Sequence, residues 1–283
     1  LVSHAIIYLR QYCVLLVLWP NISREDRRSW FNNGYLLKSN ILTQQHFTQL
    51  REEFDHHHDS LRQSYQGDTC TASILLTEAI MAKNPGVQGL LENKPLICLL
   101  QCCSGFFLQP WFYFLSIQNG CRKKPSDTKN TEADPQKQIH SDAFHPTMKA
   151  WLFLHDVTPE LGPFHYYAGS HKLSWRRLKW EYHRSVHFDQ YIDGYSERGS
   201  LRVDESDRQK LQLAKPTVFE VPENTLVIAN TFGFHHRGLA AENTIRDALW
   251  VSAWRAPFIP LPLPNITPLR HLFERRMSAF IEK

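Results

Sequence analysis

The chain has 283 residues, of which 42% are hydrophobic and 21% charged, so a disordered polymer is excluded and the length suffices for a large core. Its net charge of +4 comes from scattered basic residues, which gives no sign of a nucleic-acid-binding surface. We expect one domain over residues 1–283, with an apolar N-terminal segment of uncertain role at 1–33, a core at about 34–257, and a Pro-rich segment with a closing helix at 257–283.

The N-terminal residues 5–20 (AIIYLRQYCVLLVLWP) are largely apolar but are interrupted by Arg10. The uncharged stretch 11–23 is too short to span a bilayer, so we predict a helix that packs on the core, with membrane targeting as the alternative. A longer uncharged run at 95–121 is broken by Gly, Gln and Pro, and it favours buried strands over a membrane span. No stable membrane span is therefore expected.

Six cysteines occur without the paired spacing that is typical of zinc sites, and two of them are adjacent. We interpret all six as reduced thiols in a reducing compartment, and we therefore expect a cytoplasmic protein; a disulfide framework is the alternative. They are Cys13, Cys70, Cys98, Cys102, Cys103 and Cys121.

A turn at Asn33-Gly34 is followed by a short predicted strand at 35–37. Either Ser39 or Asn40 is expected to cap the helix that comes next. The apolar face of that helix is predicted to contain Phe47, Leu50 and Phe54.

The tract 56–59 (HHHD) has the composition of a metal site, but consecutive side chains point around a helix, so we interpret it as a solvated helix end. Further helices are predicted at 75–81 and 86–91. The apolar runs at 95–100 and 105–117 are predicted to be strands.

A polar loop at 120–138 separates these elements from a β-rich second half. The charged segment 174–191 is expected to be helical in part. The segment 257–268 is expected to be irregular because it contains five prolines, and the segment 271–281 is expected to form a closing helix. Strands are predicted at 149–157, 164–167, 216–221, 226–229 and 248–255.

Helices followed by many short strands with Pro and Gly turns are typical of a double-sheet protein. We therefore predict a mainly β fold with flanking helices and a double-stranded β-helix (jelly-roll) core. We find no internal repeat.

His140 and Asp142 form a His-x-Asp pair at the start of an apolar run. Residues i and i+2 share one side of an extended chain, so an imidazole and a carboxylate can reach one ion. Two His and one carboxylate leave open positions and suit non-haem Fe(II). The third ligand must lie far downstream, and the candidates are His235 and its neighbour His236. The pair alone is common, and a surface His beside an Asp is the competing interpretation.

The segment 140–172 (HSDAFHPTMKAWLFLHDVTPELGPFHYYAGSHK) resembles the phytanoyl-CoA dioxygenase family of iron and 2-oxoglutarate-dependent oxygenases. Residues 233–238 (GFHHRG) resemble the distal-His segment of that family, and the resemblance extends from about Gly34 to Pro257. Ala168 stands where the family usually has Pro, a change that removes no ligand.

This resemblance implies that His140, Asp142 and His235 bind Fe(II) and that Arg246 pairs with the far carboxylate of 2-oxoglutarate. A planar guanidinium matches a carboxylate better than Lys does. Lys149 and Thr147 follow the pair closely, and we predict that they reach 2-oxoglutarate from the side; a solvated Lys is the alternative.

The expected protein is a non-haem Fe(II)- and 2-oxoglutarate-dependent dioxygenase that uses O2 to hydroxylate a small organic or acyl substrate, releasing succinate and CO2. Asp142 favours hydroxylation, or another oxidation, over halogenation, because halogenases that resemble this pattern have a small residue there. His145 is a candidate second-sphere group, and Arg237 is expected to brace the distal-His loop or to reach the substrate. A catalytically inactive jelly-roll binding protein is the alternative, and a zinc hydrolase is a third possibility that leaves Arg246 without a role.

Overall fold

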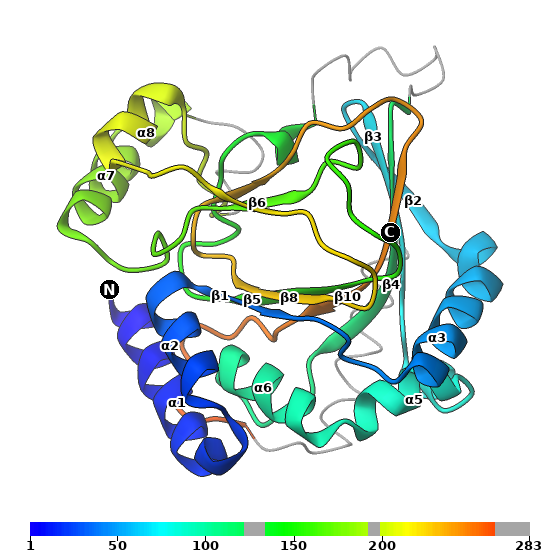
Figure 1. Cartoon of the computed structure of the whole chain (residues 1–283). Coiled ribbons are helices and arrows are strands. Elements are labelled where there is room, and N and C mark those ends of the chain that lie inside the picture. The colour runs from blue at the N-terminus through cyan, green and yellow to red at the C-terminus, as the bar shows by residue number, and fades with distance from the viewer. Residues whose placement is uncertain (122–133, 192–198, 264–283) are drawn as a thin grey trace.

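Two antiparallel β-sheets face each other in the computed structural model, which describes residues 1–121, 134–191 and 199–263 (Figure 1). The smaller sheet has the order β7 (Thr217–Phe219), β6 (Phe164–Tyr166) and β9 (His235–Arg237). The larger sheet has, in spatial order, β1 (Tyr35–Lys38), β8 (Leu226–Asn230), β5 (Met148–Phe153), β10 (Ile245–Ser252), β4 (Trp111–Asn119), β3 (Thr69–Leu75) and β2 (Arg62–Gln66).

The alternation of side chains along β5 shows how the larger sheet is used on both faces. Met148, Ala150 and Leu152 are fully buried in the hydrophobic core beneath the helices. Lys149 and Trp151 point to the opposite face and line a cavity between the sheets. Because successive residues of a strand point to opposite faces, one six-residue strand contributes both to the core and to the cavity.

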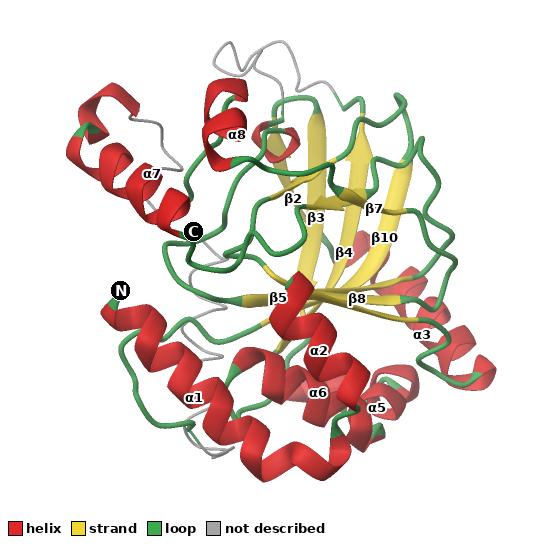
Figure 2. Ribbon diagram, turned by 60° about the vertical axis from the view of Figure 1, so that its left-hand side comes forward, coloured by secondary structure: helices red, strands yellow, loops and turns green. Residues whose placement is uncertain are grey.

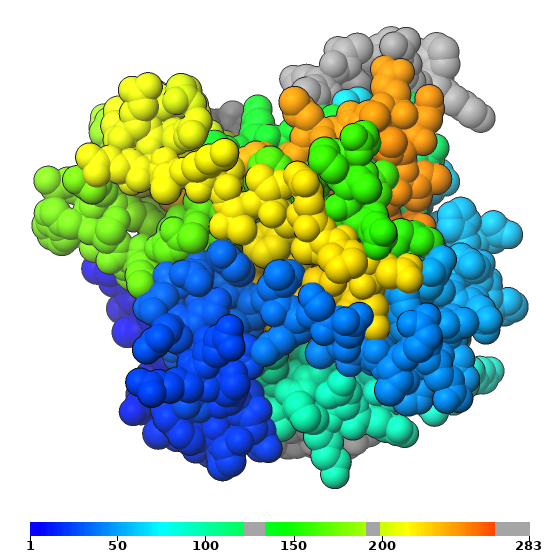
Figure 3. Space-filling model, in the orientation of Figure 1, coloured from blue at the N-terminus to red at the C-terminus, as the bar shows by residue number. Residues whose placement is uncertain are grey.

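Helices cover the outer face of the larger sheet (Figure 2). α7 (Trp175–Val186) and α8 (Glu205–Leu211) instead form a separate lobe, at the upper left of the space-filling view (Figure 3). The covering helices are α1 (Val2–Leu18), α2 (Arg24–Asn33), α3 (Gln44–His57), the short α4 (Glu78–Met81), α5 (Pro85–Glu92) and α6 (Lys94–Ser104).

The N-terminal helix α1 packs on the core, as predicted, through Ile7, Val14 and Leu15. By length and composition alone, Val2–Asn21 is also long and apolar enough to cross a membrane. Of the 18-residue apolar window within it, 39% is buried inside the protein. The helical segment begins at Val2, whereas the uncharged stretch begins only at residue 11. The whole segment therefore has the length that a bilayer requires, and the uncharged stretch alone does not.

The strand predicted at 95–100 is wrong, because these residues belong to the helix α6. Asn93 accepts a hydrogen bond from the Leu96 amide, Pro95 occupies the first turn, and Gly105 ends the helix with a φ of 72°. The buried positions of α6 recur at helical spacing: Leu96, Leu99, Leu100 and Cys103. A short apolar run does not distinguish a buried strand from a buried helix, whereas these capping residues do.

The helix predicted at 75–81 is wrong over its first residues, because Leu75 ends β3 and α4 begins only at Glu78, after the capping residue Thr77. The hairpin of β2 and β3 was not predicted, since its strands are polar and partly exposed. Its turn contains Gly67, with a φ of 60°.

The cap of α3 also differs from the prediction. Thr43 accepts a hydrogen bond from the His46 amide, and Asn40 instead adopts a left-handed conformation with a φ of 52°. Phe47, Leu50 and Phe54 are buried on one face of α3, as predicted. His56 and His57 lie at its exposed end, which confirms the interpretation of that tract as a solvated helix end.

The predicted fold class, mainly β with flanking helices and a double-sheet jelly-roll core, is confirmed. β1, β5, β6, β7, β8 and β10 all lie within or close to their predicted ranges. The closing helix predicted at 271–281 lies outside the described residues.

Gly34 is a point where the backbone allows no side chain. Its φ is 85°, and an added Cβ would lie 2.4 Å from both His171 Nδ1 and Tyr166 Oη. Gly169 has a similar φ of 77°, but its added Cβ would meet only Asn32 O, at 3.5 Å.

We expect Gly169→Ala to lower the free energy of unfolding by about 1–2 kcal/mol through backbone strain alone. We expect Gly34→Ala to lower it clearly more, because the added Cβ also clashes with His171 and Tyr166. Urea denaturation followed by circular dichroism checks this order, and equal losses would contradict the predicted clash.

Candidate metal centre

Backbone hydrogen bonds bring the two candidate histidines together although they lie far apart in the sequence. The His140 amide donates to His235 O and the His235 amide donates to His140 O, each at 2.9 Å. The Asp142 amide donates to Thr231 O, also at 2.9 Å. His140 and Asp142 therefore sit on backbone that pairs with the segment 231–235, which carries His235 itself.

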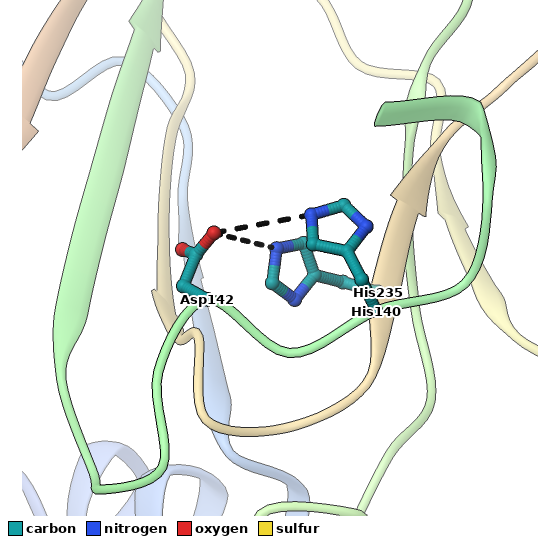
Figure 4. Close-up of side chains that lie close together, drawn as sticks. All are labelled: His140, Asp142 and His235. Atoms are coloured by element: carbon teal, nitrogen blue, oxygen red, sulfur yellow. Dashed lines mark ion pairs between the residues drawn. The ribbon is translucent and has the colours of Figure 1, made fainter. Parts of the chain in front are cut away.

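The three side chains converge on one point (Figure 4). Asp142 Oδ1 lies 3.8 Å from His140 Nε2 and 3.7 Å from His235 Nε2, and one ligand atom from each residue lies within 4.8 Å of the others. The side chains of His140 and His235 are almost fully buried, and that of Asp142 is 10% exposed. His236 is not part of this group, so the structure places His235 rather than its neighbour beside His140 and Asp142.

Both imidazoles are oriented by backbone carbonyls. His140 Nδ1 lies 2.7 Å from Gln138 O, and His235 Nδ1 lies 2.8 Å from Gly233 O. A ring whose Nδ1–H donates to a carbonyl presents the Nε2 lone pair to a metal, and such contacts fix the tautomer of metal-binding histidines. Each Nε2 therefore faces Asp142 as an electron-pair donor.

The charges of the site suit a cation. Burial lowers the pKa of His140 well below its usual value, with further lowering by His235 and Arg202, so this ring is neutral at physiological pH. Burial alone would raise the pKa of Asp142, but Lys149 and the two imidazoles outweigh it and hold that pKa well below its usual value. The site therefore offers the neutral nitrogen of His140 and one ionised carboxylate, with the ring of His235 beside them.

The side chains fit a metal better than they fit one another. The Nε2–Oδ1 distances of 3.7 and 3.8 Å are too long for hydrogen bonds, and the buried His140 Nε2 has no hydrogen-bond partner among the described residues. Such buried polar atoms normally have partners. Two His and one Asp on one side of an ion form the facial set that is used for non-haem iron.

The centre opens into a cavity of about 260 Å³ between the two sheets. Its walls combine the cavity face of the larger sheet with β9. Besides the three candidate ligands, the walls include Lys149, Trp151, Trp250, His236, Arg237 and Arg246.

Arg246 lies on this cavity wall and is 8% exposed. Its Nη1 donates to Gly162 O, and no carboxylate forms an ion pair with it among the residues that the structure describes. Burial, with help from the nearby Arg237, lowers the pKa of Arg246 to about 9. A buried guanidinium without a carboxylate partner has the chemistry to receive one from a ligand.

Arg237 has a partner of its own. Its Nη1 lies 2.7 Å from Asp134 Oδ2, and the Asp134 side chain is fully buried. This pair fastens the strand that carries His235 to the segment that precedes His140, which agrees with the bracing role expected for Arg237. Asp134 was not singled out in the sequence, because a lone Asp in a polar loop carries no signal of its partner.

Lys149 and Thr147 occupy different places. Lys149 Nζ lies in the cavity, 2.8 Å from Asp142 Oδ2 and 5.7 Å from the centre of the Trp250 ring. Thr147 is buried, its carbonyl accepts a hydrogen bond from the Thr231 amide, and it is not among the cavity-lining residues. His145 is buried too, with its Nδ1 3.0 Å from Pro146 O, and it does not line the cavity.

Comparison with known proteins yields likeness of structure only. No protein-family model matches the chain, and no curated protein matches its sequence. The non-heme alpha-ketoglutarate-dependent carbocyclase SnoK from nogalamycin biosynthesis aligns with a TM-score of 0.53 and 16% identity, over 82% of this chain and 84% of SnoK. The chain shares the fold of SnoK. This likeness supports the predicted jelly-roll core.

Two other similar structures align less closely. HygX from Streptomyces hygroscopicus, with nickel and 2-oxoglutarate bound, has a TM-score of 0.49 and 15% identity, over 86% of this chain and 95% of its own. EctD from S. alaskensis with bound Fe has a TM-score of 0.47 and 14% identity, over 82% and 76%. Membership of the phytanoyl-CoA dioxygenase family stays a prediction.

The adjacent histidines provide a matched test of the metal centre. We expect His235→Ala to abolish binding of Co(II), because it removes one of three converging ligands. His236→Ala should retain binding within a few-fold, because its ring packs against His165 and Tyr167 instead. Isothermal titration with Co(II) measures both affinities. Equal loss in the two variants would contradict the assignment of His235.

Proposed function

We propose that this protein is an Fe(II)- and 2-oxoglutarate-dependent oxygenase that oxidises a small organic or acyl substrate and releases succinate and CO2. One observation carries the proposal: two Nε2 atoms and one carboxylate oxygen converge at the wall of a cavity that also contains a buried arginine without a carboxylate partner among the described residues. The fold shared with SnoK is consistent with this chemistry.

His140, Asp142 and His235 would hold the metal, and Arg246 would bind the far carboxylate of 2-oxoglutarate. Iron with 2-oxoglutarate supplies the oxidation of the substrate by O2, coupled to decarboxylation of the cosubstrate. Asp142 offsets part of the metal's charge. The guanidinium of Arg246 orients the cosubstrate through paired N–H donors.

Lys149 is proposed to act beside the metal. Its ammonium lies on the oxygen of Asp142 that faces away from the two histidines, which leaves Oδ1 directed at the centre. From the same place it can also contact 2-oxoglutarate, as proposed from the sequence. Thr147 has the weaker support, because it does not line the cavity and acts on the site through its backbone bond to Thr231.

The cavity limits the substrate by size and character. About 260 Å³ must hold the cosubstrate as well as the reacting part of the substrate. Trp151 packs on Phe164 and Trp250 packs on Tyr113, so two rigid indole walls exclude water on one side. We propose that a small molecule, or one end of a longer acyl chain, enters there and is hydroxylated.

A reducing, cytoplasmic environment is proposed as well. All six cysteines are free thiols. Burial raises the pKa of Cys102 to about 12, which keeps this thiol protonated and unreactive.

Two measurements test the function directly. Anaerobic addition of Fe(II) and 2-oxoglutarate to the wild-type protein should produce a weak visible charge-transfer band, and aerobic incubation with a panel of small acids and acyl compounds should release succinate. Asp142→Ala should lose the band and the coupled turnover. A folded wild-type protein with neither signal would favour the inactive binding protein, and activity with zinc alone would favour a hydrolase.

Arg246 is tested by its affinity for 2-oxoglutarate. We expect Arg246→Met to weaken binding about 10- to 150-fold, the loss of one charge-assisted contact of roughly 1.5–3 kcal/mol. Arg246→Lys should fall between it and the wild type, because Lys keeps the charge without the planar fork. Arg51→Met, which removes an ion pair with Glu223 outside the cavity, serves as the control. Unchanged affinity in Arg246→Met would reject the assigned role.

A further inference from the structure

A buried arginine on α7 contacts the segment that leads into His235. Arg177 is 2% exposed and heads the largest fully buried side chains of the protein. Its Nη2 donates to Phe232 O at 2.8 Å, its Nη1 donates to Ser170 O, and its Nε donates to Glu181 Oε1 at 2.8 Å. All of its three nitrogens are thus directed at oxygen acceptors.

The same guanidinium is stacked on two aromatic rings. It lies 3.5 Å from the centre of the Phe232 ring and 4.3 Å from that of Phe234. The Phe234 amide donates to Ser170 Oγ at 2.8 Å, and Trp180 packs edge-on against the Phe234 ring. Cation–π contacts of a desolvated arginine are among the stronger ones. The side chains of Phe232 and Phe234 are therefore both held by contacts with one guanidinium, that of Arg177.

The residue between these two controls the metal-facing histidine. Gly233 O is the acceptor for His235 Nδ1, at 2.8 Å, and so sets the tautomer of that ring. The Gly233 amide donates to Asn230 O, which also accepts from the Tyr166 hydroxyl. An added Cβ at Gly233 would lie 1.9 Å from Tyr166 Oη, so the peptide has no room to shift toward that side.

Stability alone accounts poorly for an arginine at this place. Burial of a charge costs several kcal/mol before its partners compensate, and apolar residues of similar volume often pack as well. Arg177 has one carboxylate partner, Glu181, on the same helix. The other hydrogen bonds and ring contacts of its guanidinium, among the described residues, go to Ser170 and to the residues just before His235.

We propose that Arg177 is a positioning residue of the metal centre, which holds residues 232–234 so that His235 Nδ1 bonds to Gly233 O and Nε2 faces the metal. The inference rests on the proposed metal-binding role of His235. It assigns to the lobe of α7 and α8 a direct part in setting the geometry of the site.

Arg10 provides a matched control. It is also 2% exposed, it stacks on Phe106 at 3.6 Å, and its Nη1 donates to Ala256 O and Ile259 O at 2.9 and 2.8 Å. These partners of Arg10, Phe106, Ala256 and Ile259, lie outside the residues 232–234 that precede His235. Replacing Arg10 thus removes a similar buried charge and leaves the contacts of Arg177 with Phe232 and Phe234 in place.

The experiment compares Arg177→Met, Arg177→Lys and Arg10→Met with the wild type by Co(II) titration, visible d–d absorption and circular dichroism. We expect Arg177→Met to bind Co(II) about 10- to 100-fold more weakly, with an altered d–d spectrum. Arg177→Lys should show a smaller loss in the same direction, because Lys cannot span both carbonyls. Arg10→Met should lose stability but keep the wild-type affinity and spectrum.

The outcomes separate the two claims. Absence of Co(II) binding by the folded wild-type protein overturns the proposed function and the role of Arg177 with it. Wild-type binding that folded Arg177→Met matches in affinity and spectrum overturns the role of Arg177 alone. Should Arg177→Met not fold, Arg177→Lys decides: wild-type affinity and spectrum overturn the inference, and a weaker, altered complex supports it.

Discussion

The reciprocal backbone hydrogen bonds between His140 and His235 are the constraint on which the site depends. They join the segment before β5 to the start of β9, so two imidazoles from distant parts of the chain lie with ring centres 4.4 Å apart. Asp142 follows two residues later and is held by Thr231 O. Backbone pairing thus holds the candidate ligands close to one another, which lowers the cost of assembling a site from them.

Charge decides what this site can accept. Asp142 provides the one carboxylate at the centre, whereas Lys149, Arg237 and Arg246 line the same cavity. Asp134 compensates Arg237, and Lys149 lies on Asp142. Arg246 has no such partner among the described residues, so the cavity keeps a buried positive charge apart from the three candidate ligands. A dianionic cosubstrate with a metal-chelating end and a free carboxylate matches both features.

The lobe of α7 and α8 packs on the segment that leads into His235. Trp180 of α7 contacts Phe234, and Arg177 is inserted between Phe232 and Phe234. Glu181 neutralises that arginine from one helical turn away. The Gly233 carbonyl, which contacts His235 Nδ1, lies between the two phenylalanines in the chain, so α7 packs on the residues that orient this candidate ligand.

The sequence by itself predicted most of the β-rich second half and the His140–Asp142 pair, since alternating strands and the His-x-Asp spacing are local signals. Its family resemblance added His235 as the third candidate ligand. The sequence did not determine α6, where an apolar run fits helix and strand alike, or the polar hairpin of β2 and β3, whose strands are stabilised by neighbours rather than by their own pattern. The tertiary structure agrees with the choice of His235 over His236 that the family resemblance implied. Only the tertiary structure turned Lys149 onto Asp142, left Thr147 off the cavity and placed Arg177 against the residues that lead into His235. Those outcomes depend on which face of a strand meets which distant segment, and that information lies in long-range pairing, not in the spacing of neighbouring residues.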